Sequence, residues 1–582
     1  MKSLRYLNKY FYKYRYRLLL GILFVAISNI FANIPGVIIK NATNDFVEMY
    51  SHKKALDTNQ FIIYGLELIL LAVGSGFFMF LMRQFIIVVS RLIEYDMKNE
   101  IYAHYQKLDL DFYKRNNTGD LMNRISEDVG KVRMYVGPAI MYLVNTFVTI
   151  TSVIVFMWNE SWQLTLIVIT PLPVLSYMIF KISNLINQRS TRVQEELSNI
   201  TSNAQETFSG IRVIKAYNRE EYYTSKFIEQ SDKYKYTSLL LARTDAMFQP
   251  FMVFMVGLSL ISIIYFGGKF YIDGTIGSIG NLPQFVFYVF KLTWPFASLG
   301  WVSSLVQRAA ASQTRLNEFL QTEASIQNNN KDQLIVKGKI EFKNVSFTYD
   351  DTNIQALKNI SFVLHPGETL AIIGTTGSGK SSIANLIARM YDIQEGEILV
   401  DDKNIQQVNL FDLRAQTGYV PQEVFLFSDT IGNNISFAAG DNQPKEQIEQ
   451  AAKDAAVYNN IIEFPQGFET VVGERGITLS GGQKQRISIA RAIIKQPRIL
   501  IFDDCLSAVD TETEDEILNN LRRIMKGKTS IIISHRVSTV KYADNIIVLH
   551  EGEIIEQGSH KNLLGQKGEY YHLYQLQNIE QA

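Results

Sequence analysis

Six apolar windows dominate the first half of the chain and limit what it can fold into. Each is about 20 residues long, which matches the length that a helix needs to cross the hydrocarbon core of a bilayer. The windows predict six transmembrane helices over 18–39, 61–82, 136–158, 164–182, 247–271 and 282–306. The last three windows contain prolines or a lysine, and this blurs their limits.

Two charged segments, 83–135 and 183–245, separate the second window from the third and the fourth from the fifth. Both are rich in helix formers and lack the alternating pattern of strands. We therefore expect the membrane helices to continue well beyond the bilayer, and two small soluble insertions are the alternative. The basic N-terminus predicts that this end and both long segments lie on the cytoplasmic side.

The residues before the first window form a basic segment rich in aromatic side chains. Residues 1–17 are rich in lysine, arginine and tyrosine and predict an amphipathic helix on the inner leaflet. A basic flank of the first span is the alternative.

Lysine plus arginine equals aspartate plus glutamate at 57 each, so net charge offers no attraction for nucleic acid. The single cysteine, Cys505, excludes a disulfide framework and fits a cytosolic or inner-membrane protein.

The second half has the composition of a soluble domain. A polar linker is expected at 322–336, and short β-rich runs alternate with helical stretches after it. Those runs are 370–373, 499–502, 531–533 and 546–549. The predicted fold is an α-helical membrane domain over 18–321 fused to an α/β domain over 337–582.

One segment of the soluble domain fits the phosphate-binding pattern G-x-x-x-x-G-K-[ST] and follows a strand-like run, as the motif requires. In such a loop the backbone N–H groups turn toward phosphate oxygens, and the following helix adds the positive end of its dipole. Lys380 is predicted to reach the β- and γ-phosphates of ATP, and Ser381 to bind Mg²⁺. The candidate loop residues are Gly374, Thr375, Thr376, Gly377, Ser378, Gly379, Lys380, Ser381 and Ser382.

A second motif, at 498–504, places four apolar residues ahead of Asp503 and Asp504. A buried strand of this kind delivers Asp503 to the carboxyl edge of the sheet, where it can bind Mg²⁺ through water. An aspartate after an apolar strand is, by itself, usually only a strand end. Together with Lys380 and Ser381 it predicts a metal site.

The sequence Leu-Ser-Gly-Gly-Gln at 479–483 resembles the signature of ATP-binding-cassette proteins, and other motifs of that family follow the expected order. The resemblance implies that Tyr349 stacks on adenine, that Gln422 senses Mg²⁺ and water, and that His535 contacts the γ-phosphate. It also implies that the signature acts on the nucleotide held by an opposite chain. Further nucleotide-contacting candidates are Ser480, Gly481, Gly482, Gln483 and, in a D-loop, Asp510.

The resemblance extends over nearly the whole chain. Segments 118–121 and 210–215 look like the coupling regions of type IV exporters, and 473–476 resembles the exporter segment that touches the intracellular loops. It implies an ATPase half-transporter in the cytoplasmic membrane, with a second half-transporter as partner. By alternating access, this dimer is expected to export hydrophobic or amphipathic compounds, drug-like or lipid. A lipid flippase and an ATP-gated channel or sensor are the alternatives.

The chain departs from the family pattern at Asp504. Most exporters of this kind have glutamate there as the general base for water, and aspartate withdraws the carboxylate by one methylene. Misplacement of about an ångström can cost on the order of 100-fold in rate. The change resembles the slow-site subunit of heterodimeric multidrug exporters, and we favour that interpretation. A homodimer in which Asp504 is an adequate base is the alternative.

Among the charges within the predicted membrane helices, Lys291 and Glu67 bear on function. Lys291 lies in the sixth window, where a charge is expected to face a cavity, a partner or a route to the interface. It either contacts an anionic or amphipathic substrate or faces the cavity without specificity, and the sequence leaves both open. The sequence offers no explanation for Glu67 in the second window.

Overall fold

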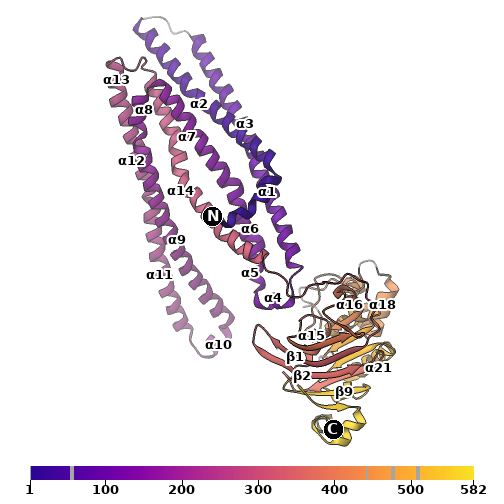
Figure 1. Ribbon diagram of the computed structural model, residues 1–582. Helices are drawn as coiled ribbons and strands as arrows, with labels where there is room; N and C mark the ends of the chain where they lie inside the picture. Colours follow the sequence, from indigo (N-terminus) through magenta and orange to yellow (C-terminus); the bar gives the residue numbers. More distant parts are fainter. Residues whose placement is uncertain (1, 53–57, 441–442, 474–478, 506–510, 582) are drawn as a thin grey trace. The chain divides into compact units, whose positions relative to one another are not determined.

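The computed structural model describes residues 2–52, 58–440, 443–473, 479–505 and 511–581 (Figure 1). It consists of two compact units. One comprises Met1–Gln106 and Thr118–Thr322 and is helical, while the other comprises Lys107–Asn117 and Glu323–Ala582 and contains the strands.

Within the described ranges, six helical stretches of the first unit are long and apolar enough to cross a membrane. They are Arg15–Ser51, Asn59–Tyr105, Thr118–Glu160, Trp162–Ser209, Glu220–Ile272 and Asn281–Leu320. Each contains one of the six predicted windows and extends beyond it, which confirms the six-helix prediction and the helical interpretation of the long charged segments. The last stretch has 40 residues. At a rise of 1.5 Å per residue it is about 60 Å long, twice the thickness of the hydrocarbon core.

The helical unit contains short turns as well as long helices. Its elements are η1 (Lys2–Leu7), α1 (Asn8–Lys13), α2 (Arg15–Ser51), α3 (Thr58–Tyr105), α5 (Thr118–Asn123), η2 (Arg124–Asp128), α6 (Val129–Met134), η3 (Tyr135–Ala139), α7 (Ile140–Glu160), α8 (Trp162–Ile169), α9 (Pro171–Ser209), α10 (Ile211–Ala216), α11 (Glu220–Ala246), α12 (Phe248–Ser262), η4 (Ile263–Gly267), α13 (Gly268–Ile272) and α14 (Asn281–Leu320). The turns η2, η3 and η4 are π-helical, so the hydrogen-bond ladder widens there without ending the helix.

The N-terminal segment differs from the single amphipathic helix expected over 1–17. It consists of η1 and α1, and Tyr14 leaves the helical conformation (φ −106°, ψ 16°) before α2 begins. Two ion pairs join it to α3, Lys9 with Glu100 (2.5 Å) and Lys13 with Asp96 (2.6 Å). These basic residues are therefore paired with carboxylates of the same unit, which the local sequence pattern does not reveal.

Lys291 has a partner that the sequence did not suggest. Its ammonium donates a hydrogen bond to the carbonyl of Ala32 in α2, three residues before Pro35 of the same helix. Proline lacks an N–H and cannot bond to the carbonyl four residues earlier, that of Phe31, so the bond from Lys291 lies in the turn that this proline leaves incomplete. Lys291 therefore joins α14 to α2 at the proline of α2.

The described strands of the second unit form two sheets. The first has four strands in the order β2-β1-β4-β5, all antiparallel. The second has six strands in the order β10-β9-β3-β8-β7-β6, parallel except for β10. The four predicted β-rich runs lie in β3, β7, β8 and β9, which confirms the α/β prediction for this part of the chain.

The bounds of the elements in this unit are α4 (Leu110–Arg115), β1 (Ile340–Tyr349), β2 (Ile354–Leu364), β3 (Thr369–Gly374), α15 (Lys380–Ile387), β4 (Glu395–Val400), β5 (Lys403–Asn404), α16 (Leu410–Ala415), β6 (Thr417–Val420), α17 (Ile431–Ser436), α18 (Lys445–Asp454), α19 (Tyr458–Ile462), η5 (Gly467–Glu469), α20 (Gly481–Ile493), β7 (Ile499–Asp503), α21 (Thr511–Met525), β8 (Thr529–Ile533), α22 (Val537–Val540), β9 (Asn545–His550), β10 (Glu553–Gly558), α23 (His560–Gln566) and α24 (Glu569–Gln581).

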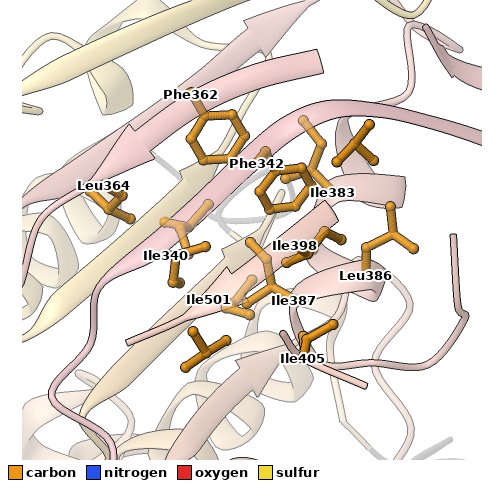
Figure 2. Packing of buried hydrophobic residues seen from close by; sticks show 14 of the residues in the cluster. Ile340, Phe342, Phe362, Leu364, Ile383, Leu386, Ile387, Ile398, Ile405 and Ile501 are labelled. Atoms are coloured by element: carbon orange, nitrogen blue, oxygen red, sulfur yellow. The ribbon is translucent and has the colours of Figure 1, made fainter. Parts of the chain in front are cut away.

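An apolar core joins both sheets to α15 (Figure 2). Ile383 and Ile387 of α15 are fully buried in it, and the rings of Phe342 and Phe362 stack with centroids 4.5 Å apart. Burying a side chain of this size contributes about 1.5–3 kcal/mol. The core thereby fixes the position of α15, and with it the loop that precedes this helix.

Helix α4 belongs to the second unit although its neighbours in sequence, α3 and α5, belong to the first. Asp109 caps α4 by accepting a hydrogen bond from the backbone N–H of Phe112 (3.1 Å). The same carboxylate accepts from the amide (2.7 Å) and the hydroxyl (2.6 Å) of Ser325 in the predicted linker. The segment 118–121, which resembled a coupling region, lies in the first unit, and the residues just before it lie with the sheets.

Candidate nucleotide-binding site

The glycine-rich loop connects β3 to α15, and β3 lies between β8 and β9 inside the six-stranded sheet. Gly379 has φ +97°, and a Cβ at this position would collide with the carbonyl of Ala356. Gly374 is confined in the same way by the carbonyl of Leu549. Glycine is therefore required at both ends of the loop, because other residues tolerate neither the conformation nor the close approach.

Lys380 opens α15 and is buried beneath the loop. Its ammonium donates to the carbonyls of Gly374 (3.0 Å) and Thr375 (2.7 Å) and lies 3.4 Å from the hydroxyl of Ser378. Burial lowers the pKa of Lys380 from the ordinary 10.5 to about 8, although the carboxylates of Asp504 and Asp503 act in the opposite direction. The ammonium remains charged at pH 7 and is surrounded by acceptors that phosphate oxygens can replace.

Ser381 and Asp503 meet at the end of β7. The hydroxyl of Ser381 donates to the carboxylate of Asp503 at 3.0 Å, and Asp503 is buried. Burial raises the pKa of Asp503 to about 6, against the stabilising hydrogen bond from Ser381. A hydroxyl beside a buried carboxylate offers hard oxygen ligands of the kind that Mg²⁺ prefers. The described residues contain no cluster of three or more His, Cys, Asp or Glu, so a cation here needs further ligands from phosphates and water.

One pocket of about 500 Å³ brings most of the predicted residues together. This volume lies within the range of about 300–1,000 Å³ that small-molecule sites occupy. The predicted site residues that line it are Tyr349, Thr376, Gly377, Ser378, Gly379, Lys380, Ser381, Ser382, Gln422, Asp503, Asp504 and His535. The loop candidates Gly374 and Thr375 are not among them. The rest of the loop and the residues at or just after the ends of β1, β6, β7 and β8 therefore border one cavity.

Asp504 and His535 lie on neighbouring strand ends at this pocket. Asp504 has φ +45°, a conformation that aspartate tolerates better than most residues, and its amide donates to the carbonyl of Ile533 (2.9 Å). The pKa of His535 is lowered by burial and by the charge of Lys380, which favours the neutral imidazole. The side chains of Asp504 and His535 thus border the same space as the glycine-rich loop.

The signature segment lies at the start of α20 and outside the described lining of the pocket. Ser480 caps α20 by accepting from the backbone N–H of Gln483 (3.2 Å), and the Gln483 side chain accepts from the amide of Ser480 (2.9 Å). This reciprocal pair is a capping box. Ser480 and Gly481 are exposed, so the positive end of α20 faces outward. The resemblance had not suggested this capping role.

Some pocket residues were missed by the sequence analysis, and some predicted residues lie outside the described part. The missed lining residues are Ile354, Gln355, Ala356, Lys358, Ile533, Glu551 and Gly552. They come from β2, the end of β8 and the β9–β10 turn, where Lys358 donates its amide to Gly552 (2.8 Å). No local pattern marks them, because strand pairing between distant segments brings them together. Asp510 and residues 474–476 fall outside the described residues.

Comparisons with known proteins find two matching family models and several similar chains. Residues 17–296 match the model of the ABC transporter transmembrane region, and residues 357–507 match the ABC transporter model. The chain is 37% identical to an ATP-dependent lipid A-core flippase of Syntrophus aciditrophicus over 508 residues, or 87% of this chain and 83% of that one. It is 36% identical to the multidrug resistance-like ATP-binding protein MdlA of Escherichia coli, over 90% of this chain and 89% of that one.

Two further likenesses extend over almost the entire chain. A probable multidrug resistance ABC transporter ATP-binding/permease protein of Bacillus subtilis, YheI, is 35% identical over 99% of this chain and 98% of its own length. The solved structure of a bacterial Atm1-family ABC exporter with ATP bound matches with a TM-score of 0.81 and 28% identity, over 97% of this chain and 99% of that one.

Proposed function

The chain belongs to the ABC transporter family, and on this premise we propose that it is one half of a two-chain exporter. Its membrane and nucleotide-binding regions make it an ATPase coupled to transport. We infer that it exports hydrophobic or amphipathic molecules, in line with the lipid and multidrug names of its relatives. We assign the membrane domain to 18–321 and the nucleotide-binding domain to 337–582, and we place the N-terminus and the latter domain in the cytoplasm.

The position of the signature segment carries the proposal of two chains. Ser480 and Gly481 start α20 in an exposed position, outside the described lining of the chain's own pocket. A helix N-terminus attracts anions through its free N–H groups and its dipole. In the proposed dimer, this end of α20 contacts the terminal phosphate held by the opposite chain, so that two chains enclose two ATP molecules.

Phosphate binding is proposed to depend on Lys380, Ser381 and Asp503. Lys380 exchanges its loop acceptors for β- and γ-phosphate oxygens and balances their charge. Ser381 and Asp503 supply oxygen ligands for Mg²⁺, which, when bound, neutralises charge on the phosphates. This arrangement also relieves the cost of a buried carboxylate beside Asp504, because a cation is its natural counter-charge.

Water activation is proposed to depend on Asp504, Gln422 and His535, which line the same pocket. Asp504 accepts the proton of the attacking water, and Gln422 orients that water. His535 is neutral and retains one N–H, with which it donates to a γ-phosphate oxygen. The side chains therefore divide into one group that holds the phosphates and one that directs the water.

Reconstitution into liposomes tests the export function directly. We expect ATP-dependent movement of a fluorescent amphipathic dye or of a headgroup-labelled phospholipid across the bilayer, and no movement in the Lys380→Ala variant. Comparing the two probes separates drug-like from lipid cargo. ATP-dependent ion conductance without movement of either probe would instead support a gated channel.

Substitution of Ser480 tests the role of the signature segment. Ser480→Ala removes the hydroxyl and the cap, which costs about 0.5–2 kcal/mol of helix stability. Ser480→Asp keeps a capping oxygen but brings a negative charge toward the opposite phosphate. We expect both variants to lower ATP turnover strongly and to leave ATP affinity at the chain's own site unchanged, whereas hydrogen exchange in α20 rises only in Ser480→Ala. Normal turnover in Ser480→Asp would show that the residue serves only as a cap.

A further inference from the structure

Lys114 of α4 contacts the ring of Tyr349, which lines the nucleotide pocket. We propose that Lys114 positions this ring for the adenine base. The proposal rests on the ATP-driven function proposed above and adds a residue to it. The base and the Lys114 ammonium would then contact the same ring, that of Tyr349.

The contact is between an ammonium and two rings. The Nζ atom of Lys114 lies 4.3 Å from the ring centroid of Tyr349 and 5.0 Å from that of Tyr391. The two rings are 5.3 Å apart and nearly perpendicular, at 88°. Both distances are within the roughly 6 Å over which a cation is attracted by an aromatic face. The ammonium of Lys114 therefore contacts two tyrosine rings of the nucleotide-binding domain that are nearly perpendicular to each other.

Of these two tyrosines, Tyr349 lines the pocket. It is the last residue of β1 and lines the pocket together with the glycine-rich loop. Its hydroxyl lies 3.0 Å from the hydroxyl of Ser382, two residues after Lys380 in α15. The ring of Phe347 packs against it at 4.7 Å and 75°. The ring is thus held at its hydroxyl by α15, at its side by β1 and on its face by α4.

Other contacts hold α4 in place without Lys114. Asp109 joins the start of α4 to Ser325. At the end of α4, Arg115 lies 3.6 Å from Asp350, which directly follows β1, and its pair with Asp111 (2.8 Å) is internal to the helix. Removing the Lys114 charge should therefore leave α4 docked, and the effect of the substitution on the ring can be measured separately.

The physical consequence follows from preorganisation and linkage. A ring that is already oriented loses less conformational freedom when a base stacks on it, so the base binds more tightly. If the contact between Lys114 and Tyr349 raises the affinity for the base by some factor, binding of the base favours that contact by the same factor. The affinity for ligands that lack a base should not depend on Lys114, because such ligands do not stack on Tyr349.

The test measures binding to the full chain in lipid nanodiscs, with Mg²⁺ withheld to prevent turnover. We expect Lys114→Gln to weaken ATP binding by about 2- to 5-fold, the effect of losing a cation–π contact at a partly exposed site. Affinity for inorganic tripolyphosphate should not change, and Lys114→Arg should restore ATP affinity because arginine also stacks on aromatic faces. In a Tyr349→Leu background, Lys114→Gln should have no further effect.

The matched control is Lys107→Gln, which removes an exposed lysine three residues before α4. Wild-type ATP affinity in Lys114→Gln, equal weakening of ATP and tripolyphosphate, or a full effect in the Tyr349→Leu background would each overturn the proposal. The function proposed above fails separately, if Lys380→Ala leaves ATP affinity intact. Loss of binding in Lys380→Ala with no effect of Lys114→Gln contradicts the inference about Lys114 alone.

Discussion

Lys380→Ala is expected to lower ATP affinity at the chain's own site by about 100-fold or more, because each hydrogen bond to a charged group contributes about 1.5–3 kcal/mol. The ammonium donates to the carbonyls of Gly374 and Thr375 and is the cation that we propose to contact the phosphates. Without it, the bound polyphosphate would face Asp503 and Asp504 with no protein counter-charge at this point. Calorimetric titration with ATP measures the loss.

Two variants make the result specific. Lys358→Ala removes another lysine that lines the same pocket but lies in β2, so we expect a much smaller change in ATP affinity. Lys380→Met keeps an apolar stem of similar length. Because burial lowers the pKa of Lys380 to about 8, folding disfavours its charged form, and the nucleotide-free Met variant should unfold at the same temperature or higher. Unchanged ATP affinity in Lys380→Ala would contradict the assignment of the loop.

Asp504→Glu is expected to raise ATP turnover at the chain's own site by on the order of 100-fold. The backbone of Asp504 is fixed by its hydrogen bond to Ile533, so the carboxylate can approach the water only through a longer side chain. Charge is conserved, and ATP affinity should therefore change little. Single-turnover hydrolysis in lipid nanodiscs measures the rate without a contribution from product release.

The controls separate side-chain length from charge. Asp504→Gln has the length of glutamate but cannot accept the proton, so it should hydrolyse ATP no faster than wild type. Slow wild-type turnover that glutamate restores supports a slow site and a heterodimer with a sister subunit. Rapid wild-type turnover with no gain from glutamate means that Asp504 is a competent base. That result would support a homodimer of this chain.

Features that depend on consecutive residues followed from the sequence alone. The six membrane helices depend on the length and apolarity of single windows, and each window lies inside one helix. The loop from Gly374 to Lys380 requires glycine for conformation and close approach, and both are visible as residue types at fixed spacing. The apolar runs before Asp503 and in β3 identify buried parallel strands in the same way.

Contacts between distant segments were decided only by the tertiary structure. Three such contacts join residues far apart in the chain, namely Lys9 with Glu100, Lys291 with Ala32, and Lys114 with Tyr349. Neither periodicity nor composition records such partners, because many lysines in the sequence have the same local surroundings. Local patterns therefore determined which long elements form and where phosphate is predicted to bind, and the packing of those elements determined which side chains surround the candidate site.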